Sequence, residues 1–360
     1  MDLSPFDFTG PLPPERVQGR DALLADLTAR VTARSPTALL GPRRFGKTSV
    51  LRRLASDLTE VTTLTVDLMP VQSPHDAVRA LTVTLLDTDA TVAQAATEVS
   101  ATLGFNLLAL RGEVRSTRRA DRPDPDVAFA NLVDTLVKTA LQRPTVVIFD
   151  EFQQIATLAN GTAVLRSALQ HHYKDIGLLF AGSAPSAMRG IFSNHDQPFL
   201  HQAEIVEIQA LSLDAVQDII NDGFAETGRT PGAVASLVHS FTRGHPLRTM
   251  QAAHAAWQHA EEAPGDQVWG RAVAALRKSA RASVSVLYDQ LPTTQQKALR
   301  ILANGGSVYG AAAQTLALGK GSAQQALSSL LAGGHVLDDD GSARVTDPFL
   351  ADWLRATHPL

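Results

Sequence analysis

The distribution of apolar and polar positions divides the chain into three regions. Between about residues 15 and 205, short apolar runs alternate with segments of helical periodicity, which is the pattern of an α/β protein with a parallel sheet. The stretch from about 213 to 260 is helical, with breaks at Gly228 and Gly244. From about residue 283 onward, short helices surround a β-hairpin with an Asp-Asp-Asp-Gly turn. We therefore predict three domains, residues 1–205, 206–282 and 283–360.

Four apolar runs of the first region are expected to form strands of the sheet. Three are short and mainly apolar, as is typical of a parallel strand buried on both faces, and the second, 62–68, mixes threonines with apolar residues. They cover residues 37–40, 62–68, 144–150 and 176–183. Ligands of open α/β sheets bind at the carboxyl ends of the strands, so the residues that follow these runs are the first candidates for chemistry.

The first run leads into the segment Gly-Pro-Arg-Arg-Phe-Gly-Lys-Thr at 41–48, which matches G-x-x-x-x-G-K-[ST] at every fixed position. Glycines let successive backbone N–H groups point into one concavity that binds phosphate oxygens. Lys47 is expected to reach the β- and γ-phosphates, and the Thr48 hydroxyl to coordinate Mg²⁺. The helix that follows adds its N-terminal dipole. The predicted phosphate site is Gly41, Pro42, Arg43, Arg44, Phe45, Gly46, Lys47, Thr48 and Ser49.

Arg43 and Arg44 lie inside this loop but are expected to face solvent or an adjacent subunit. The backbone and Lys47 already supply the cradle for the phosphates.

The run at 144–150 ends in two adjacent carboxylates, Asp150 and Glu151. Taken alone, such a pair is more typical of a solvated turn. Because it follows a phosphate-binding loop by about 100 residues, we interpret it as the acidic half of a nucleotide site. Asp150 is expected to hold the hydration shell of Mg²⁺, and Glu151 to polarise the water that attacks the γ-phosphorus.

The run at 176–183 ends on Ser183. In many nucleotide hydrolases a polar side chain at the end of this strand lies between the two nucleotide motifs and senses the γ-phosphate. We therefore count Ser183 with Lys47 and Glu151 as a candidate catalytic residue. The alternative is that Ser183 caps the helix beginning near Pro185. The sequence is compatible with both roles.

Composition narrows the classes of chemistry. The 360 residues include no cysteine, which excludes disulfides, thiolate zinc sites and cysteine nucleophiles. The histidines show no metal-ligand spacing, so no zinc site is assigned. The first residues lack the features of a signal peptide, and no apolar run reaches 18 residues. A formal charge of −4 argues against a protein that coats nucleic acid. We expect a cytoplasmic protein.

Together these segments resemble the archaeal-type ATPases, a group of the AAA+/STAND class of P-loop ATPases. The resemblance covers essentially the whole chain, and its strongest parts are the two nucleotide motifs and their spacing. The matching segments are residues 5–10, 13–20, 41–48, 67–68, 150–153, 182–183, 198–199, 244–246 and 347–355.

The resemblance implies ATP as the nucleotide, a helical lid and a C-terminal winged-helix domain. It assigns Gly244 and Pro246 to a lid element that contacts nucleotide. It also places the adenine base against the N-terminal segment Val17, Gln18, Gly19 and Arg20. Related proteins often carry an arginine after Pro198-Phe199 that reaches a neighbouring subunit's nucleotide, whereas this chain has none there. Arg189 and Arg243 are the nearest candidates, and ring-type cooperative hydrolysis is in doubt.

The C-terminal region gives weak support for DNA binding. The third helix of a winged helix would run from about 321 to 331 and present Gln324, Gln325, Ser328 and Ser329, with only Lys320 as a nearby cation. The wing tip is the run Asp338-Asp339-Asp340, which would repel a phosphate backbone. A protein-docking or autoinhibitory role is favoured. From residue 283 five cations face six aspartates: Lys297, Arg300, Lys320, Arg344 and Arg355 against Asp289, Asp338, Asp339, Asp340, Asp347 and Asp352.

A basic insertion lies between the second and third strands. It follows residues 104–110, a possible β-hairpin arm, and contains Arg111, Arg115, Arg118, Arg119 and Arg122. A solvated loop and a contact with a partner or nucleic acid are both compatible with this composition.

Two functional classes follow from the sequence. In the first, a slow Mg²⁺-dependent ATPase acts as a nucleotide-gated switch that holds a protein partner in its ADP form and releases it, or oligomerises, with ATP. In the second, the chain is a DNA-associated ATPase or regulator that binds DNA through the winged helix or the arginine-rich insertion. The negative net charge of the chain favours the first class. A protein that binds ATP without hydrolysing it is a third class, disfavoured by Glu151.

Overall fold

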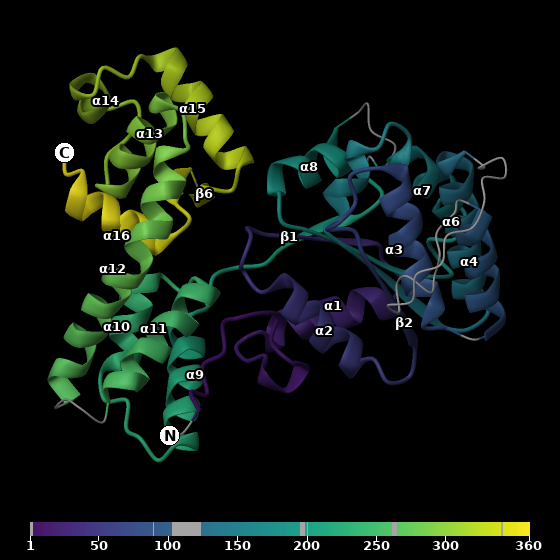
Figure 1. Ribbon diagram of the computed structural model, residues 1–360, viewed down its shortest axis with the longest axis horizontal. Helices are drawn as coiled ribbons and strands as arrows, with labels where there is room; N and C mark the ends of the chain where they lie inside the picture. Colours follow the sequence, from purple (N-terminus) through teal and green to yellow (C-terminus); the bar gives the residue numbers. More distant parts are fainter. Residues whose placement is uncertain are drawn as a thin grey trace. The chain divides into compact units, whose positions relative to one another are not determined.

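The computed structural model describes residues 3–88, 90–102, 124–194, 199, 201–260, 265–339 and 341–360. The described chain forms two compact units (Figure 1). The first comprises Met1–Asp21, Pro42–Val50 and Ile208–Leu360, and the second Ala22–Gly41 and Leu51–Glu207. Each unit has its own hydrophobic core. The arginine-rich insertion with its preceding arm, Pro198 and Asp340 lie outside the described residues.

The second unit is built on a parallel sheet with strand order β2-β3-β4-β1-β5. Four of its strands are the ones predicted from the apolar runs. The fifth, β5, was not predicted, because it has only four residues and its side chains are exposed or half-buried at the edge of the sheet. The strands are β1 (Thr37–Leu40), β2 (Thr62–Asp67), β3 (Thr145–Asp150), β4 (Gly177–Gly182) and β5 (Glu204–Glu207).

Helices cover both faces of this sheet. The chain crosses from β1 to β2 in one direction and returns through β3, β4 and β5 in the other. Since parallel crossovers are right-handed, the helix after β1 must lie on the opposite face from the later ones. Figure 1 shows α1 and α2 on one side of the strands and α7 and α8 on the other. Their bounds are α1 (Asp21–Thr32), α2 (Lys47–Asp57), α7 (Gly161–Leu169) and α8 (Pro185–Ser193).

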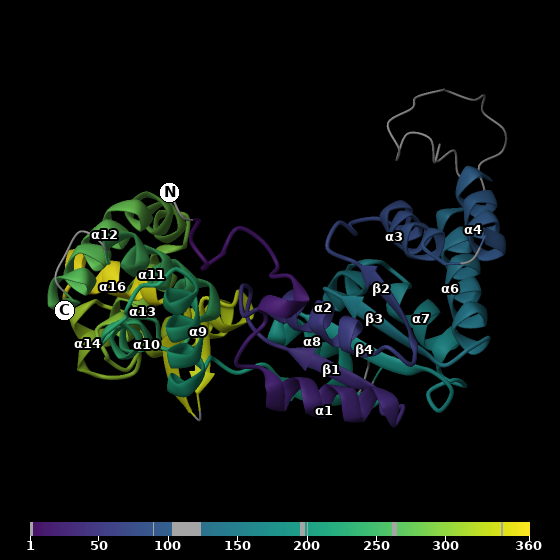
Figure 2. The ribbon, with the colours of Figure 1, turned by 90° about the horizontal axis from the view of Figure 1, so that it is seen from below.

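Three further helices pack beside the β2 edge, where Figure 2 shows them side by side. Their N-termini carry the expected signals: Ser73 caps α3 with Pro74 as its first residue, and Asp124 caps α6 with Pro125 as its first residue. The helices are α3 (Pro74–Leu86), α4 (Ala90–Thr102) and α6 (Pro125–Leu141).

Five buried phenylalanines pack behind the carboxyl ends of β3 and β4. Their ring centroids lie between 4.7 and 5.9 Å apart. Such pairs contribute about 0.5–1.5 kcal/mol each beyond their burial. The cluster anchors the turn that leads from β3 into the short helix η2 (Phe152–Thr157). Its members are Phe149, Phe152, Phe180, Phe192 and Phe199.

The first unit contains the lid and the C-terminal region around one core. The breaks predicted at Gly228 and Gly244 separate three helices, α9 (Leu213–Glu226), α10 (Val234–Thr242) and α11 (Pro246–His259). The C-terminal elements follow in the predicted order of helices and hairpin. They are α13 (Thr293–Ala303), α14 (Ala311–Thr315), α15 (Lys320–Ala332), β6 (Val336–Asp339), β7 (Ser342–Val345) and α16 (Pro348–Thr357).

A long helix, α12 (Gly265–Asp289), joins the lid to the C-terminal region. The boundary predicted at 282/283 falls inside this helix. Ala272, Leu276 and Val284, on both sides of that position, enter the same core. The three-domain division remains a prediction from the sequence. Every helix of the described ranges is too short or too polar to cross a membrane.

Candidate nucleotide site

The carboxyl ends of β3 and β4 bring Glu151 and Ser183 together. Phe149 pairs with Phe180 in the parallel register, so the residues just beyond the two strands are neighbours. The Glu151 carboxylate accepts a hydrogen bond of 2.6 Å from the Ser183 hydroxyl and a longer one, 3.4 Å, from the Ser183 backbone N–H. Both residues are buried. The Ser183 side chain therefore orients the carboxylate.

The capping alternative for Ser183 is wrong. Helix α8 begins at Pro185, and its N-cap residue is Ala184. No side chain caps the helix, because the serine lies one position too early and its hydroxyl donates to Glu151 instead.

The backbone also holds Glu151 in place. Its φ of 56° and ψ of 42° lie in the left-handed region, which residues other than glycine rarely adopt. Such a conformation costs on the order of 1 kcal/mol and persists only where the surroundings enforce it. Here the next residue, Phe152, is fully buried in the phenylalanine cluster. The Glu151 N–H donates to Asp150 Oδ1 at 3.0 Å, which fixes the two carboxylates relative to each other.

Gln153 is a site residue that the sequence analysis did not single out. Its side-chain amide N–H donates to Oε2 of Glu151, the same carboxylate oxygen that accepts from Ser183. Its carbonyl oxygen, Oε1, is buried and accepts no hydrogen bond from the described residues. The available signal was its place two residues after Glu151, next to the apolar Phe152. Gly182 leaves room for this amide, since a Cβ there would lie 2.6 Å from Oε1.

The phosphate-binding loop contains two residues with positive φ. Gly46 has a φ of +85° and Arg44 a φ of +67°, so the chain curls before α2 begins at Lys47. The Lys47 ammonium donates to the Pro42 carbonyl at 2.8 Å, across the loop, and is buried. Arg43 and Arg44 are exposed, as expected from the sequence.

A cavity of about 420 Å³ lies within the first unit. The N-terminal segment, the loop and the lid helices α9 and α11 line it, and Ile219, Asp222 and Met250 contribute from the lid. Its volume falls in the range of small-molecule sites, roughly 300–1,000 Å³. The predicted nucleotide residues that line it are Val17, Gln18, Arg20, Phe45, Gly46, Ser49 and Pro246.

Gly19 and Gly244 do not line this cavity. A Cβ on Gly19 would lie 2.5 Å from Ala215 Cβ, and one on Gly244 would lie 2.0 Å from the Leu211 carbonyl oxygen. Both have positive φ, and the Leu211 N–H donates to the Gly244 carbonyl at 2.8 Å. In the structure these glycines therefore allow close packing of the cavity walls.

Comparisons with known structures identify the fold of the chain. No protein-family model and no curated protein matches the sequence. The structure is similar to the Walker-type ATPase PABY2304 of Pyrococcus abyssi, with a TM-score of 0.68 and 17% identity over 97% of this chain and 99% of that chain. It is also similar to the Aeropyrum pernix ORC2 protein in its ADPNP–ADP complexes, with a TM-score of 0.58 and 16% identity over 97% and 94% of the two chains. The chain has the fold of a Walker-type ATPase.

At these identities the match establishes the fold, and the chemistry must be argued from the residues. The Walker-type ATPase fold confirms the predicted α/β P-loop core. The loop residues Lys47 and Thr48 belong to the first compact unit and Asp150 and Glu151 to the second. That Thr48 and Asp150 share a Mg²⁺ ion therefore stays a prediction from the motifs.

Arg20 is a buried cation that lines the cavity of the first unit. Its guanidinium donates to the carbonyls of Gln209, at 2.8 Å, and Phe45, at 3.4 Å. Among the described residues no carboxylate pairs with it. Burial lowers the pKa of Arg20 to about 10, so the side chain remains charged at neutral pH. A cation of this kind attracts an anionic ligand.

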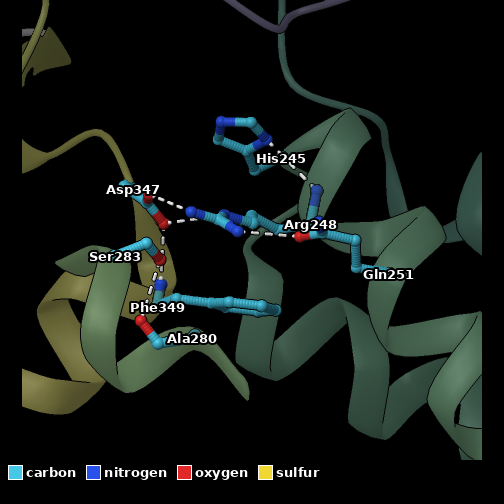
Figure 3. A network of polar contacts seen from close by, with 7 residues as sticks. All are labelled: His245, Arg248, Gln251, Ala280, Ser283, Asp347 and Phe349. Atoms are coloured by element: carbon cyan, nitrogen blue, oxygen red, sulfur yellow. Dashed lines mark hydrogen bonds and ion pairs between the residues drawn. The ribbon is translucent and has the colours of Figure 1, made fainter. Parts of the chain in front are cut away.

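The lid element at Gly244–Pro246 continues into a polar network (Figure 3). His245 caps α11 by accepting from the Arg248 N–H, and its ring packs edge-on against Phe45 at a centroid distance of 4.9 Å. Arg248 forms a two-pronged ion pair with Asp347, its Nε lying 3.0 Å from Oδ1, and its guanidinium stacks 4.4 Å from the Phe349 ring. Burial lowers the pKa of His245 to about 4, so the ring is neutral near pH 7.

Proposed function

We propose that the protein binds ATP with Mg²⁺ and hydrolyses it to ADP and phosphate. The observation that carries this proposal is the buried Glu151 carboxylate, held by Ser183 and Gln153 directly after Asp150 at the end of β3. The donors from Ser183 and Gln153 all meet Oε2 of Glu151, which fixes the orientation of the carboxylate so that it can accept a further hydrogen bond from a water molecule.

The described residues fit the proposed nucleotide. Adenine and ribose would occupy the cavity of the first unit between Val17, Gln18 and the lid residues Ile219 and Pro246, where the walls are largely apolar. The phosphates would replace the Pro42 carbonyl as the partner of Lys47, because an anion is the stronger acceptor for an ammonium. The adenine assignment and the roles of Gly19 and Gly244 beside it come from the family resemblance.

The metal assignment rests on the sequence motifs. Thr48, at the start of α2, and Asp150 supply the hydroxyl and carboxylate oxygens that Mg²⁺ prefers. The ion would neutralise charge on the phosphates.

In the proposed mechanism Glu151 orients the attacking water and accepts its proton. The Gln153 carbonyl oxygen, which lacks a donor among the described residues, is a second acceptor for that water. Ser183 keeps the Glu151 carboxylate in place and would sense the γ-phosphate. Lys47 would stabilise the charge that develops on the transferred phosphoryl oxygens.

The test is phosphate release from purified protein with Mg²⁺-ATP, for wild type, Glu151→Gln and Lys47→Ala. We expect both variants to lose turnover, with nucleotide binding retained in Glu151→Gln and lost in Lys47→Ala. Asp57→Asn, on the exposed part of α2, is the matched control. Turnover by Glu151→Gln at the wild-type rate would refute the assigned role.

We further propose that hydrolysis operates a slow switch on a protein partner. The lid and the C-terminal region share one core, and α12 is continuous between them, so the two would move together when the nucleotide changes. Oligomerisation with ATP belongs to the same proposal. Arg189 and Arg243 were the candidates for an arginine that reaches a neighbouring subunit's nucleotide. Arg189 pairs with Glu207, and Arg243 is exposed at the end of α10.

The second candidate is a DNA-associated ATPase with a C-terminal winged helix. One observation favours it: Gln324, Gln325, Ser328 and Ser329 are all exposed on α15. The test adds duplex DNA at about 50 mM salt and compares wild type with a variant in which Arg115, Arg118 and Arg119 are changed to Glu. Salt-sensitive binding that this variant loses, with stimulated turnover, would support DNA. Absence of binding would leave the protein-directed switch.

A further inference from the structure

A groove of about 370 Å³ lies in the first unit between α12 and α16, apart from the cavity proposed for nucleotide. Its walls are mainly apolar, with Leu276 and Val284 from α12 and with Phe349 and Trp353 from α16. Phe241 at the end of α10 completes the aromatic lining, 5.6 Å from the Phe349 ring. A pocket with three aromatic side chains suits an apolar body.

The polar part of the groove is basic. Arg277, Lys278 and Arg281 line it from α12, and Asp352 is the one carboxylate among the lining residues that the structure describes. Arg277 uses both of its nitrogens on Asp352, at 2.9 Å each. Lys278 and Arg281 are exposed and have no acidic partner in the described chain. The lining therefore carries two positive charges that nothing described neutralises.

We propose that this groove binds an organic anion with an apolar body, such as a medium-chain or aromatic carboxylate. The apolar walls would take the body, and Lys278 and Arg281 would pair with the carboxylate. The lining residues of α12 from Leu276 to Val284 span nine residues, or about 12 Å, which matches a chain of about ten carbons. The aromatic walls favour this ligand over a nucleic-acid backbone, whose phosphates need cations alone.

The groove also borders the network of Figure 3. Phe349 lines the groove and carries the Arg248 guanidinium on its ring, and Asp352 lies on the same helix, α16, that Asp347 caps. A ligand in the groove would therefore contact the helix that is tied by an ion pair to the first turn of the lid helix α11.

The experiment uses the anionic probe 8-anilinonaphthalene-1-sulfonate with the full-length protein and no nucleotide, so its outcome is independent of ATP hydrolysis. Probe fluorescence is titrated and then competed with decanoate and with its uncharged counterpart 1-decanol. We expect saturable binding that decanoate reverses, with 1-decanol about tenfold weaker.

Two variants separate this groove from other apolar sites. Changing Lys278 and Arg281 together to Glu should weaken decanoate about tenfold, and Ala356→Trp, at an exposed lining residue, should block probe and decanoate alike. Lys320→Glu, an exposed cation of the same unit outside the groove, is the matched control and should bind as wild type. Circular dichroism checks that each variant is folded.

Three results would overturn the proposal. The first is equal decanoate affinity in wild type and the double charge variant. The second is equal competition by 1-decanol and decanoate. The third is displacement of the probe by a short DNA duplex or an acidic peptide but not by decanoate at about 150 mM salt, which would assign the groove to a macromolecule.

Discussion

At the scale of single residues, the site depends on how Glu151 is held. Its neighbour Asp150 and its place after a strand were predictable, because both follow from the order of residues in the chain. The two donors to its carboxylate were not equally predictable. Ser183 was one of two alternatives, and Gln153 contacts Glu151 only because the left-handed turn at Glu151 folds η2 back toward it.

We predict that Ser183→Ala lowers kcat about tenfold and changes the KM for ATP by less. The alanine removes a donor of 2.6 Å that orients Glu151 and leaves the phosphate loop intact. Steady-state phosphate release as a function of ATP concentration separates the two parameters. Ser183→Thr, which keeps the hydroxyl, should recover most of the rate. A rise in KM with an unchanged kcat would show instead that the serine binds nucleotide.

A second prediction concerns the pH dependence of stability. Because burial lowers the pKa of His245 from 6.5 to about 4, the unfolded state binds the proton more tightly than the native state. The free energy of unfolding is therefore unaffected by His245 protonation above about pH 6.5, and it decreases as the pH falls from 6.5 toward 4. A difference of this size corresponds to about 3 kcal/mol in the free energy of unfolding.

Urea unfolding between about pH 4 and pH 7.5 measures this effect in wild type and His245→Asn. Asparagine keeps a side-chain acceptor for the Arg248 N–H but does not titrate. We expect the variant to have the flatter profile over this range. Parallel profiles for the two proteins would show that His245 does not titrate as its burial implies.

At the scale of elements, the lid and the last helix are joined through side chains far apart in sequence. Arg248 lies in the first turn of α11, and Asp347 is the N-cap of α16. The side chains are 9% and 24% exposed, so the pair is mostly removed from water. The pair Arg277–Asp352 joins α12 to the same helix and is a natural reference, because its arginine is 58% exposed although its aspartate is 12% exposed.

We predict that Asp347→Asn lowers the free energy of unfolding by about 2–3 kcal/mol, because it leaves a largely buried arginine without its anion. Asparagine preserves the cap to the Phe349 N–H, so the loss reports on the ion pair. Asp352→Asn should lower it by at most about 1 kcal/mol. Urea unfolding of both variants, with a double-mutant cycle through Arg248→Met, makes the comparison. Equal losses at the two sites would contradict it.

At the scale of the whole molecule, two cores of similar extent coexist in one chain. The first unit gathers three separate stretches of sequence, including the N-terminal segment and most of the phosphate loop. The cavity proposed for nucleotide lies entirely within it. Ligand binding should therefore stabilise this unit directly.

We predict that Mg²⁺-ADP at 100 times its Kd stabilises the native protein by about 2.7 kcal/mol. The effect should be strongest in the cavity walls. Hydrogen exchange read by mass spectrometry should show new protection in residues 16–20 and in α9, and none in Lys47→Ala. Protection confined to the C-terminal hairpin would place the nucleotide elsewhere.

The sequence by itself determined the phosphate loop, the acidic pair after β3, four of the five strands and the order of the C-terminal elements. These features are local: a strand, a turn or a helix start is set by residues adjacent in the chain. The short edge strand β5 lacked such a signal, since four half-exposed residues show no clear period.

Only the tertiary structure decided which distant side chains meet. The Glu151–Ser183 contact depends on the order of β3 and β4 in the sheet, and the Arg248–Asp347 pair on how two helices pack. It also decided that Gly19 and Gly244 serve close packing and that α12 crosses a predicted domain boundary. The reason is physical: such contacts follow from packing a shared core, and no local pattern encodes which element lies across it.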